Sequence, residues 1–172
     1  MNFELSLAQS VGLISFALGI ATFFQRRTRR LKVMMLVFNL NHLIHFLLMG
    51  APVSAFGALI SVFRTYASIY LSSIYVALAF MMTNLVVGTW LATSWFDAFA
   101  IAGSMIGTYA LFMLTGTAMR YAFLLGSTCW FINNLIIGSI GGILLEATVI
   151  CVNLVTIYRL NRCQQQQLAM EH

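Results

Sequence analysis

Seven apolar stretches, each about as long as a helix that crosses a membrane, run through this chain. A spanning helix needs about 20 predominantly apolar residues. The stretches cover residues 5–24, 31–49, 52–71, 74–91, 95–115, 119–137 and 139–158, and a short polar tail at 159–172 follows them. Only 8% of the residues are charged, whereas soluble domains have about 25%, so a soluble globular domain is excluded. The sequence predicts an all-α membrane protein with a single transmembrane domain of seven transmembrane helices.

The boundary between the third and fourth stretches is the least marked, because no Gly run or charge cluster separates Pro52 from Trp90. A single helix over these residues would be about twice as long as the hydrocarbon core is thick. The chain must therefore turn between them, and Ser72 and Ser73 are the predicted place of the turn. Pro52 itself suits the first turn of a helix, where its missing N–H has no partner to lose.

The basic residues predict which way the helices cross the membrane. A run of them separates the first apolar stretch from the second: Arg26, Arg27, Arg29, Arg30 and Lys32. If the N-terminus lies outside, every Lys and Arg except Arg64 falls on the cytoplasmic side, in agreement with the positive-inside rule. A basic run between two apolar stretches is typical of a loop facing anionic lipid, so no nucleic-acid partner is predicted. The sequence thus predicts an outer N-terminus and a cytoplasmic C-terminus.

A weak internal repeat divides the chain into two halves. A shift of 89 residues places His45 on Asn134 and Arg64 on Asn153. Each residue and its counterpart lie four spans apart, in the second and sixth stretches or in the third and seventh. Because four is an even number, the two halves would have the same orientation in the membrane. The predicted units are a first repeat at 5–71, a linker helix at 74–91 and a second repeat at 95–158. We therefore expect two parallel three-helix bundles joined by a linker helix, a 3+1+3 arrangement.

Two segments carry a resemblance to a known family. These are GLISFALGIATFFQRRTRR at 12–30 and ALFMLTGTAMRYAFLLGSTCWFINNLIIGSIGGILLEATVICVNLVTIYRL at 110–160, in which GSIGG followed by Glu146 is the most specific part. In these segments the chain resembles the YgjV family of bacterial inner-membrane proteins. The resemblance implies a multi-pass protein of the bacterial inner (plasma) membrane, and it does not imply any particular activity.

The 3+1+3 arrangement also resembles, more distantly, the PQ-loop superfamily, which includes the SWEET sugar transporters. That resemblance implies a central substrate site lined by an Asn on the third helix of each bundle. Asn153 matches this position in the second half, whereas Arg64 stands there in the first half. The Pro-Gln motif of the first helix is absent, because Pro52 is the only proline.

Polar and ionisable side chains inside the apolar stretches are the candidate site residues, because lipid tolerates them poorly. Counted along the predicted helices, they form an outer layer of His42, His45 and Glu146, and a layer near the membrane midplane of Arg64 and Asn153. The predicted substrate-binding residues are Arg64, Asn153, Asn134, His45 and Trp130. His42 and Glu146 are the predicted proton-coupling residues, because an imidazole and a carboxylic acid inside one cavity can exchange a proton.

Each of these residues also has a purely structural interpretation. Arg64 could extend its side chain toward the cytoplasmic phosphates, although the tilt of the Cα–Cβ bond directs it the other way. Glu146 could form a pair with a structural partner, and asparagines in membrane helices often only join neighbouring helices by hydrogen bonds. Trp90, Trp95 and Trp130 suit the membrane interface, and of these only Trp130 shares a helix face with Asn134.

The function most consistent with these patterns is transport of a small polar or anionic solute by alternating access, with proton coupling as an option. The alternative is a scaffold, sensor or sorting protein of the same fold that transports nothing.

The chain contains no GxSxG, HExxH or P-loop motif, so no enzyme activity is predicted. His42 and His45 are spaced to face one ion, but the ligand set is sparse, and neither a metal nor a cofactor is predicted. The lipid bilayer is the one certain partner, and the oligomeric state is left open.

Overall fold

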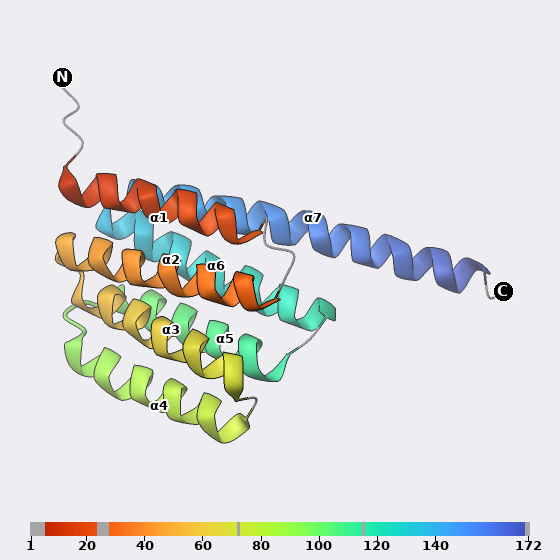
Figure 1. The fold of residues 1–172 in the computed structure, drawn as a ribbon, viewed down its shortest axis with the longest axis horizontal. Coiled ribbons are helices and arrows are strands. Elements are labelled where there is room, and N and C mark those ends of the chain that lie inside the picture. The colour runs from red at the N-terminus through yellow and green to blue at the C-terminus, as the bar shows by residue number, and fades with distance from the viewer. Residues whose placement is uncertain (1–5, 24–27, 72, 115, 171–172) are drawn as a thin grey trace.

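The computed structural model describes residues 6–23, 28–71, 73–114 and 116–170, and within them the chain forms seven α-helices (Figure 1). The helices are α1 (Leu7–Phe23), α2 (Thr28–Leu48), α3 (Pro52–Tyr70), α4 (Ile74–Leu91), α5 (Asp97–Met113), α6 (Gly116–Ile137) and α7 (Ile140–Met170). The prediction of an all-α protein with seven helices is confirmed. Helix α3, helix α4 and residues Ile140–Arg159 of α7 are long and apolar enough to cross a membrane, and α1, α2 and α5 contain shorter apolar segments.

The connections between the helices are short, and their sequences explain where the helices end. Gly50 follows the end of α2 and Gly138 follows the end of α6, and these glycines have positive φ angles of 67° and 71° respectively. At each end the next residue donates its backbone N–H to a carbonyl five residues back, from Ala51 to Phe46 and from Ser139 to Asn134. These paired bonds around a left-handed glycine are a common way to terminate a helix. The two turns thus have the same geometry, 88 residues apart in the sequence.

The turn expected at Ser72 and Ser73 lies between α3 and α4, because α3 ends at Tyr70 and α4 begins at Ile74. Ser73 precedes α4 with an extended backbone. Ser72 lies outside the described residues. Pro52 occupies the first turn of α3, as its missing N–H predicts. The prediction that the chain turns between the third and fourth spans is confirmed.

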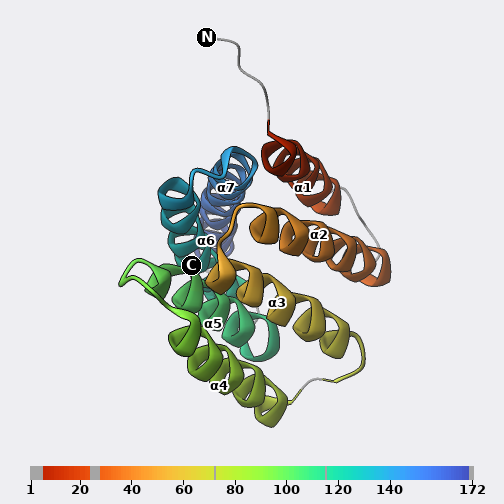
Figure 2. The ribbon, with the colours of Figure 1, turned by 90° about the vertical axis from the view of Figure 1, so that its left-hand side faces the viewer.

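Six of the seven described helices form a closed ring. Neighbours in the chain pack together within α1–α2–α3 and within α5–α6–α7, and the contacts of α1 with α7 and of α3 with α5 close the ring (Figure 2). Helix α4 lies outside the ring and packs against α3 and α5. Among the described residues, α1 and α3 are not in contact. Within the ring α1, α2 and α3 follow one another, as do α5, α6 and α7, and the division of the chain into two equivalent units remains a prediction.

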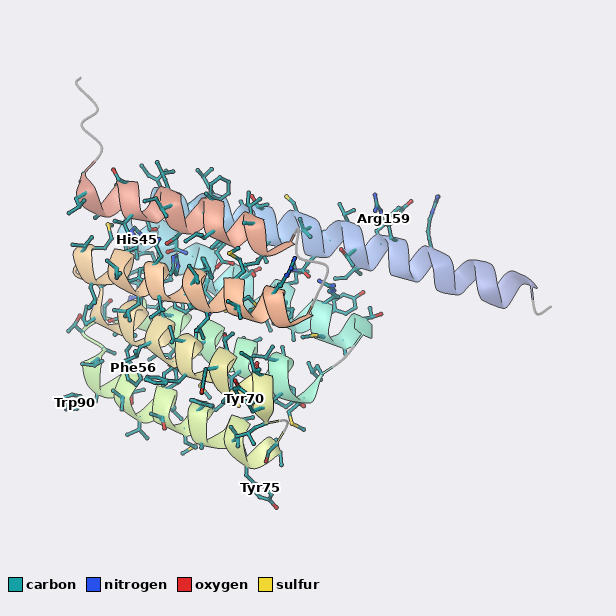
Figure 3. All side chains as sticks on the ribbon, viewed as in Figure 1. His45, Phe56, Tyr70, Tyr75, Trp90 and Arg159 are labelled. Atoms are coloured by element: carbon teal, nitrogen blue, oxygen red, sulfur yellow. The ribbon has the colours of Figure 1, made fainter. Side chains whose placement is uncertain are left out.

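Apart from Arg64, the basic residues named below lie at one end of the bundle. Helices α1, α3, α5 and α7 all end on the same side, opposite the start of α1 (Figure 1). Arg120 lies in the first turns of α6 on that side, and Arg159 and Arg162 lie in the part of α7 that projects beyond the other helices (Figures 1 and 3). Residues 159–170 of the expected polar tail therefore continue helix α7.

The interior of the bundle is rich in polar groups, whereas its surface is apolar. Among the described residues the fully buried side chains include His45, Asn84, Asn134, Thr65 and Thr108. The most exposed side chains are large and apolar or aromatic, such as Trp90 (81% exposed) and Tyr75 (80% exposed) at the two ends of α4 (Figure 3). This distribution suits a protein surrounded by lipid, in which polar groups must find partners inside the structure.

Helices α1 and α7 approach each other more closely than any side chain would allow. A Cβ atom on Gly141 would overlap the backbone carbonyl of Gly12. Farther along the same pair, Gly19 accommodates the side chain of Leu145. Small residues at such positions let the backbones of two membrane helices pack directly against each other. The α1–α7 contact that closes the ring therefore depends on glycine on both helices.

Candidate functional site

His45 joins three parts of the ring near the end where α1 begins (Figure 3). Its Nδ1 lies 2.8 Å from the carbonyl oxygen of Ala8 in α1, and its Nε2 lies 2.6 Å from the hydroxyl of Ser139 at the start of α7. A carbonyl oxygen only accepts, so Nδ1 donates to Ala8 and the neutral ring accepts the Ser139 proton at Nε2. Ser139 Oγ in turn accepts the backbone N–H of Gly142. His45 therefore connects α2 with both α1 and α7.

His42 lies one turn before His45 in a cluster of rings. Its imidazole stacks on Phe38 at 5.1 Å, meets Phe46 edge-on at 4.3 Å and lies 5.7 Å from the His45 ring, all between ring centroids. The Nδ1 atom of His42 is buried and has no partner among the described residues. Since most buried polar atoms in proteins are hydrogen-bonded, this nitrogen marks a position that a ligand or a water molecule would satisfy.

Trp130 fills the middle of the ring. Its indole stacks on Phe46 of α2, with 5.7 Å between centroids and 16° between planes. A Cβ atom on Gly57 of α3 would lie 3.1 Å from this indole, and one on Gly103 of α5 would lie 2.8 Å from it. Two glycines on separate helices therefore make room for the Trp130 ring. Of the three tryptophans, Trp130 is the one that faces inward, whereas Trp90 and Trp95 are exposed.

Asn134 is fully buried, and neither its amide nitrogen nor its amide oxygen has a partner among the described residues. Its side chain faces Gly142, where a Cβ atom would collide with both Asn134 and the Ser139 hydroxyl. Asn134 is thereby placed beside the hydroxyl that binds His45. The neighbouring Asn133 exchanges hydrogen bonds of 3.0 and 3.2 Å with Ser54 of α3.

Arg64 is bonded across the contact between α3 and α5. Its Nη1 donates to the Ser104 carbonyl at 3.2 Å and to the Thr108 hydroxyl at 3.1 Å, and its Nη2 donates to the Ser61 hydroxyl at 3.2 Å. Ser104 lies seven residues into α5, while Arg64 lies twelve residues into α3, a helix that starts at the same end. The guanidinium therefore points back toward the start of α3, as the Cα–Cβ tilt requires. The Arg64 side chain therefore does not extend toward the end of α3, the direction that the structural interpretation of this residue required.

Glu146 and Asn153 face α6 from two positions on α7. The Ser127 hydroxyl of α6 is the hydrogen-bonding neighbour of the Glu146 carboxyl group. Asn153 is buried, accepts a hydrogen bond of 3.5 Å from Arg120 and donates one of 3.0 Å to the carbonyl of Val149. Glu146 and Asn153 thus line the contact between α6 and α7.

The structure therefore distributes the candidate residues over three places. His42, His45 and Trp130 share one aromatic cluster, and Asn134 adjoins it through Ser139. Arg64 lies between α3 and α5, and the residues on α7 lie against α6. The substrate-binding and proton-coupling roles of these residues remain predictions. Among the described residues, no three His, Cys, Asp or Glu side chains come together in a way that could hold a metal ion.

Several polar groups of this region were missing from the sequence prediction. Ser139 follows a helix-ending glycine and precedes α7, a position typical of a helix N-cap, so its pattern was detectable. Ser104 and Thr108 lie four residues apart on α5 and therefore on one face, beside Gly103 and Gly107. Their partnership with Arg64 required the contact between α3 and α5, which no local pattern predicts.

Comparison with known proteins places the chain in a family. A family described as bacterial inner membrane protein (Imp-YgjV) matches residues 6–164. The inner membrane protein YgjV of Escherichia coli (strain K12) is 32% identical over 160 residues, which cover 93% of this chain and 87% of that protein. No solved structure matches the chain. With its apolar helices and polar interior, the chain belongs to the YgjV family of bacterial inner membrane proteins and is a multi-pass protein of that membrane.

Proposed function

We propose that this protein transports a small polar or anionic solute across the bacterial inner membrane by alternating access. In this proposal α1–α3 and α5–α7 are two parallel units, and α4 is the linker that gives them the same orientation. The N-terminus lies outside and the C-terminus lies in the cytoplasm. The two units rock against each other and open the interior of the ring to one side at a time.

The observation that carries the proposal is a set of buried polar atoms without partners among the described residues, contributed by both halves of the ring. They are Nδ1 of His42 and Nε of Arg64 in the first half, and Oγ of Ser104 and both amide atoms of Asn134 in the second. In a membrane each unsatisfied polar group costs several kcal/mol, about as much as a lost hydrogen bond in hydrocarbon. Buried polar groups that bind a polar solute would be kept in the protein despite this cost in stability.

The contacts between the two halves include several hydrogen bonds, and these support a rocking motion. Near the start of α1, the Gln9 side chain donates to the Gly138 carbonyl at 2.7 Å and accepts the Ile140 N–H at 3.1 Å. On the opposite side of the ring, Arg64 donates to groups of α5. Hydrogen bonds of this kind can be exchanged for bonds to water when a contact opens. The same contacts hold the ring closed in the described state.

A coupling proton would be carried by His42 and Glu146. His42 has an unpartnered ring nitrogen, and Glu146 is half-buried with a neutral hydroxyl of Ser127 as its neighbour. No ion pair holds either group in one charge state among the described residues. An acid and an imidazole inside a membrane protein are suited to take up and release protons during a transport cycle.

Counterflow in reconstituted vesicles tests the proposal. Vesicles containing the protein should accumulate at least one labelled solute from a panel of small carboxylates, amino acids, sugars and phosphate esters. Glu146→Gln should reduce this accumulation at least tenfold, and Arg64→Ala should abolish it, because each removes an ionisable group of the proposed pathway. Thr89→Ala on α4 is the matched control, because its hydroxyl is exposed and bonds only to its own helix.

The absence of transport for every solute of the panel, with both variants as active as the wild type in cells, would contradict the proposal. The alternative function, a scaffold, sensor or sorting protein, would then stand. One structural observation favours that alternative: α7 projects beyond the rest of the bundle on the proposed cytoplasmic side (Figure 1). A partner cross-linked to residues 159–170 in cells lacking any transport activity would support it.

Labelling of single cysteines tests the proposed orientation. In a variant without the native cysteines, Ser94→Cys in the α4–α5 connection should react with a membrane-impermeant maleimide in intact spheroplasts. Leu71→Cys, at the end of α3, should react only after the membrane is made permeable. Both positions are exposed, so access alone decides the result. Labelling of Leu71→Cys but not Ser94→Cys in intact spheroplasts would reverse the orientation.

A further inference from the structure

The charge of Arg64 has no counter-charge in the described part of the structure. Its three partners are a backbone carbonyl and two hydroxyl groups, all of them neutral. Both hydroxyl protons are already used, because Ser61 donates to the Gly57 carbonyl at 2.9 Å and Thr108 donates to the Ser104 carbonyl at 2.8 Å. A guanidinium keeps its proton under all ordinary conditions. The α3–α5 contact therefore holds a positive charge that an anion would neutralise.

The donors that remain free on Arg64 define the shape of that anion. A guanidinium has five N–H donors, and the bonds of Arg64 to Ser104, Thr108 and Ser61 come from Nη1 and Nη2. The Nε–H and one Nη2–H are left, and Nε is buried without a partner among the described residues. Nε and Nη2 belong to one edge of the planar group, and two donors along one edge match the two oxygens of a carboxylate.

A second unpartnered donor lies on the facing helix. The hydroxyl of Ser104 is buried, with the residue 1% exposed, and has no partner among the described residues. The carbonyl of the same residue accepts a hydrogen bond from Nη1 of Arg64, which places Ser104 next to the guanidinium. Gly107, the next small residue of α5, faces the guanidinium, and a Cβ atom there would lie 3.0 Å from Nη1. The glycine thus leaves room for the arginine head group.

We infer that Arg64 and Ser104 form a binding site for the carboxylate group of a small monocarboxylate. One carboxylate oxygen accepts the Nε–H of Arg64, the other accepts the free Nη2–H, and the Ser104 hydroxyl donates to either. A single negative charge balances the single buried positive charge, which favours a monocarboxylate over a dianion. The inference deepens the proposed function by naming the class of solute, and it rests on that function only for its role in transport.

Equilibrium binding of acetate to the purified full-length protein in lipid nanodiscs tests the site without any gradient. Acetate should bind saturably, and sulfate and glucose should not displace it. Arg64→Gln should weaken acetate binding at least tenfold, because it removes the charge and the free edge. Ser104→Ala should weaken it about fivefold and leave the thermal stability unchanged, since the lost hydroxyl has no hydrogen-bond partner among the described residues.

The two variants keep the inference falsifiable even where one of them folds poorly. If Arg64→Gln aggregates, the Ser104→Ala result decides, with Thr89→Ala as the variant that should bind acetate as the wild type does. Saturable acetate binding unaffected by either substitution would overturn the site, as would the absence of acetate binding. Chloride binding as tight as acetate binding would overturn the carboxylate assignment. Because binding is measured without transport, the site can fail while counterflow of another solute succeeds, and the reverse also holds.

Discussion

Replacement of Gly141 by alanine is expected to prevent α7 from packing against α1. The added methyl group would overlap the backbone of Gly12, and a backbone cannot turn aside as a side chain can. Forced insertion into a well-packed contact costs about 1–3 kcal/mol and more where the backbone must move. We expect Gly141→Ala to lower the free energy of unfolding by about 3 kcal/mol. The variant should therefore lose its monodisperse peak at a lower temperature than the wild type when both are heated in mild detergent.

Gly142→Ala is the matched control for this prediction. The atoms nearest to the same methyl group one residue later belong to the side chains of Asn134 and Ser139, which can move without displacing a helix backbone. It should therefore destabilise the protein less than Gly141→Ala does. Equal stability of Gly141→Ala and the wild type would mean that α1 and α7 do not approach each other as described. The ring would then be open between these two helices.

Replacement of His45 by alanine is expected to lower the stability about as much as Gly141→Ala does. His45 is fully buried, bonds to α1 through Ala8 and to the start of α7 through Ser139, and its ring packs against Gly12. The substitution removes two hydrogen bonds and leaves a cavity, which together cost about 3 kcal/mol. Reversible unfolding in mixed detergent micelles should reveal this loss as an earlier midpoint.

Ser139→Ala tests one of the two hydrogen bonds of His45 without the other. It removes the hydroxyl that donates to Nε2 but keeps the bond from Nδ1 to Ala8, so it should cost about 1–2 kcal/mol. A glutamine at position 45 should restore part of the stability, because its amide can both donate and accept. If His45→Ala and Ser139→Ala each unfold like the wild type, the imidazole does not join the helices. The ring closure would then depend on the glycines alone.

The fold could be predicted from the sequence largely because its helices are long, apolar and separated by short turns. Pro52 and the glycines at positions 50 and 138 mark helix ends through their own backbone geometry, which is a local property. The turn after Tyr70 has no such marker and was predicted from the thickness of the membrane instead. The closure of the ring could not be predicted, because it depends on contacts between residues far apart in the chain.

The candidate site was predicted in part. The buried polar side chains were found because each is conspicuous in an apolar helix, and His45 and Asn134 do lie in the interior. Their partners were not found, since depth along a helix gives no information on which neighbour a side chain faces. Arg64 and Asn153 were expected in one layer, but one faces α5 and the other faces α6 and its own helix. The rotation of each helix about its own axis decides which neighbour a side chain faces. The sequence does not give this rotation, because the apolar periodicity of a helix is weak where its outer face contacts lipid.

Helix α4 contacts only α3 and α5 among the described helices, so it contributes nothing to the enclosure itself. The six other described helices close on one another through their own contacts. Side-chain changes on the outward face of α4 should therefore alter the surface that this helix offers to lipid or to a neighbouring protein, and leave the contacts among those six helices unchanged.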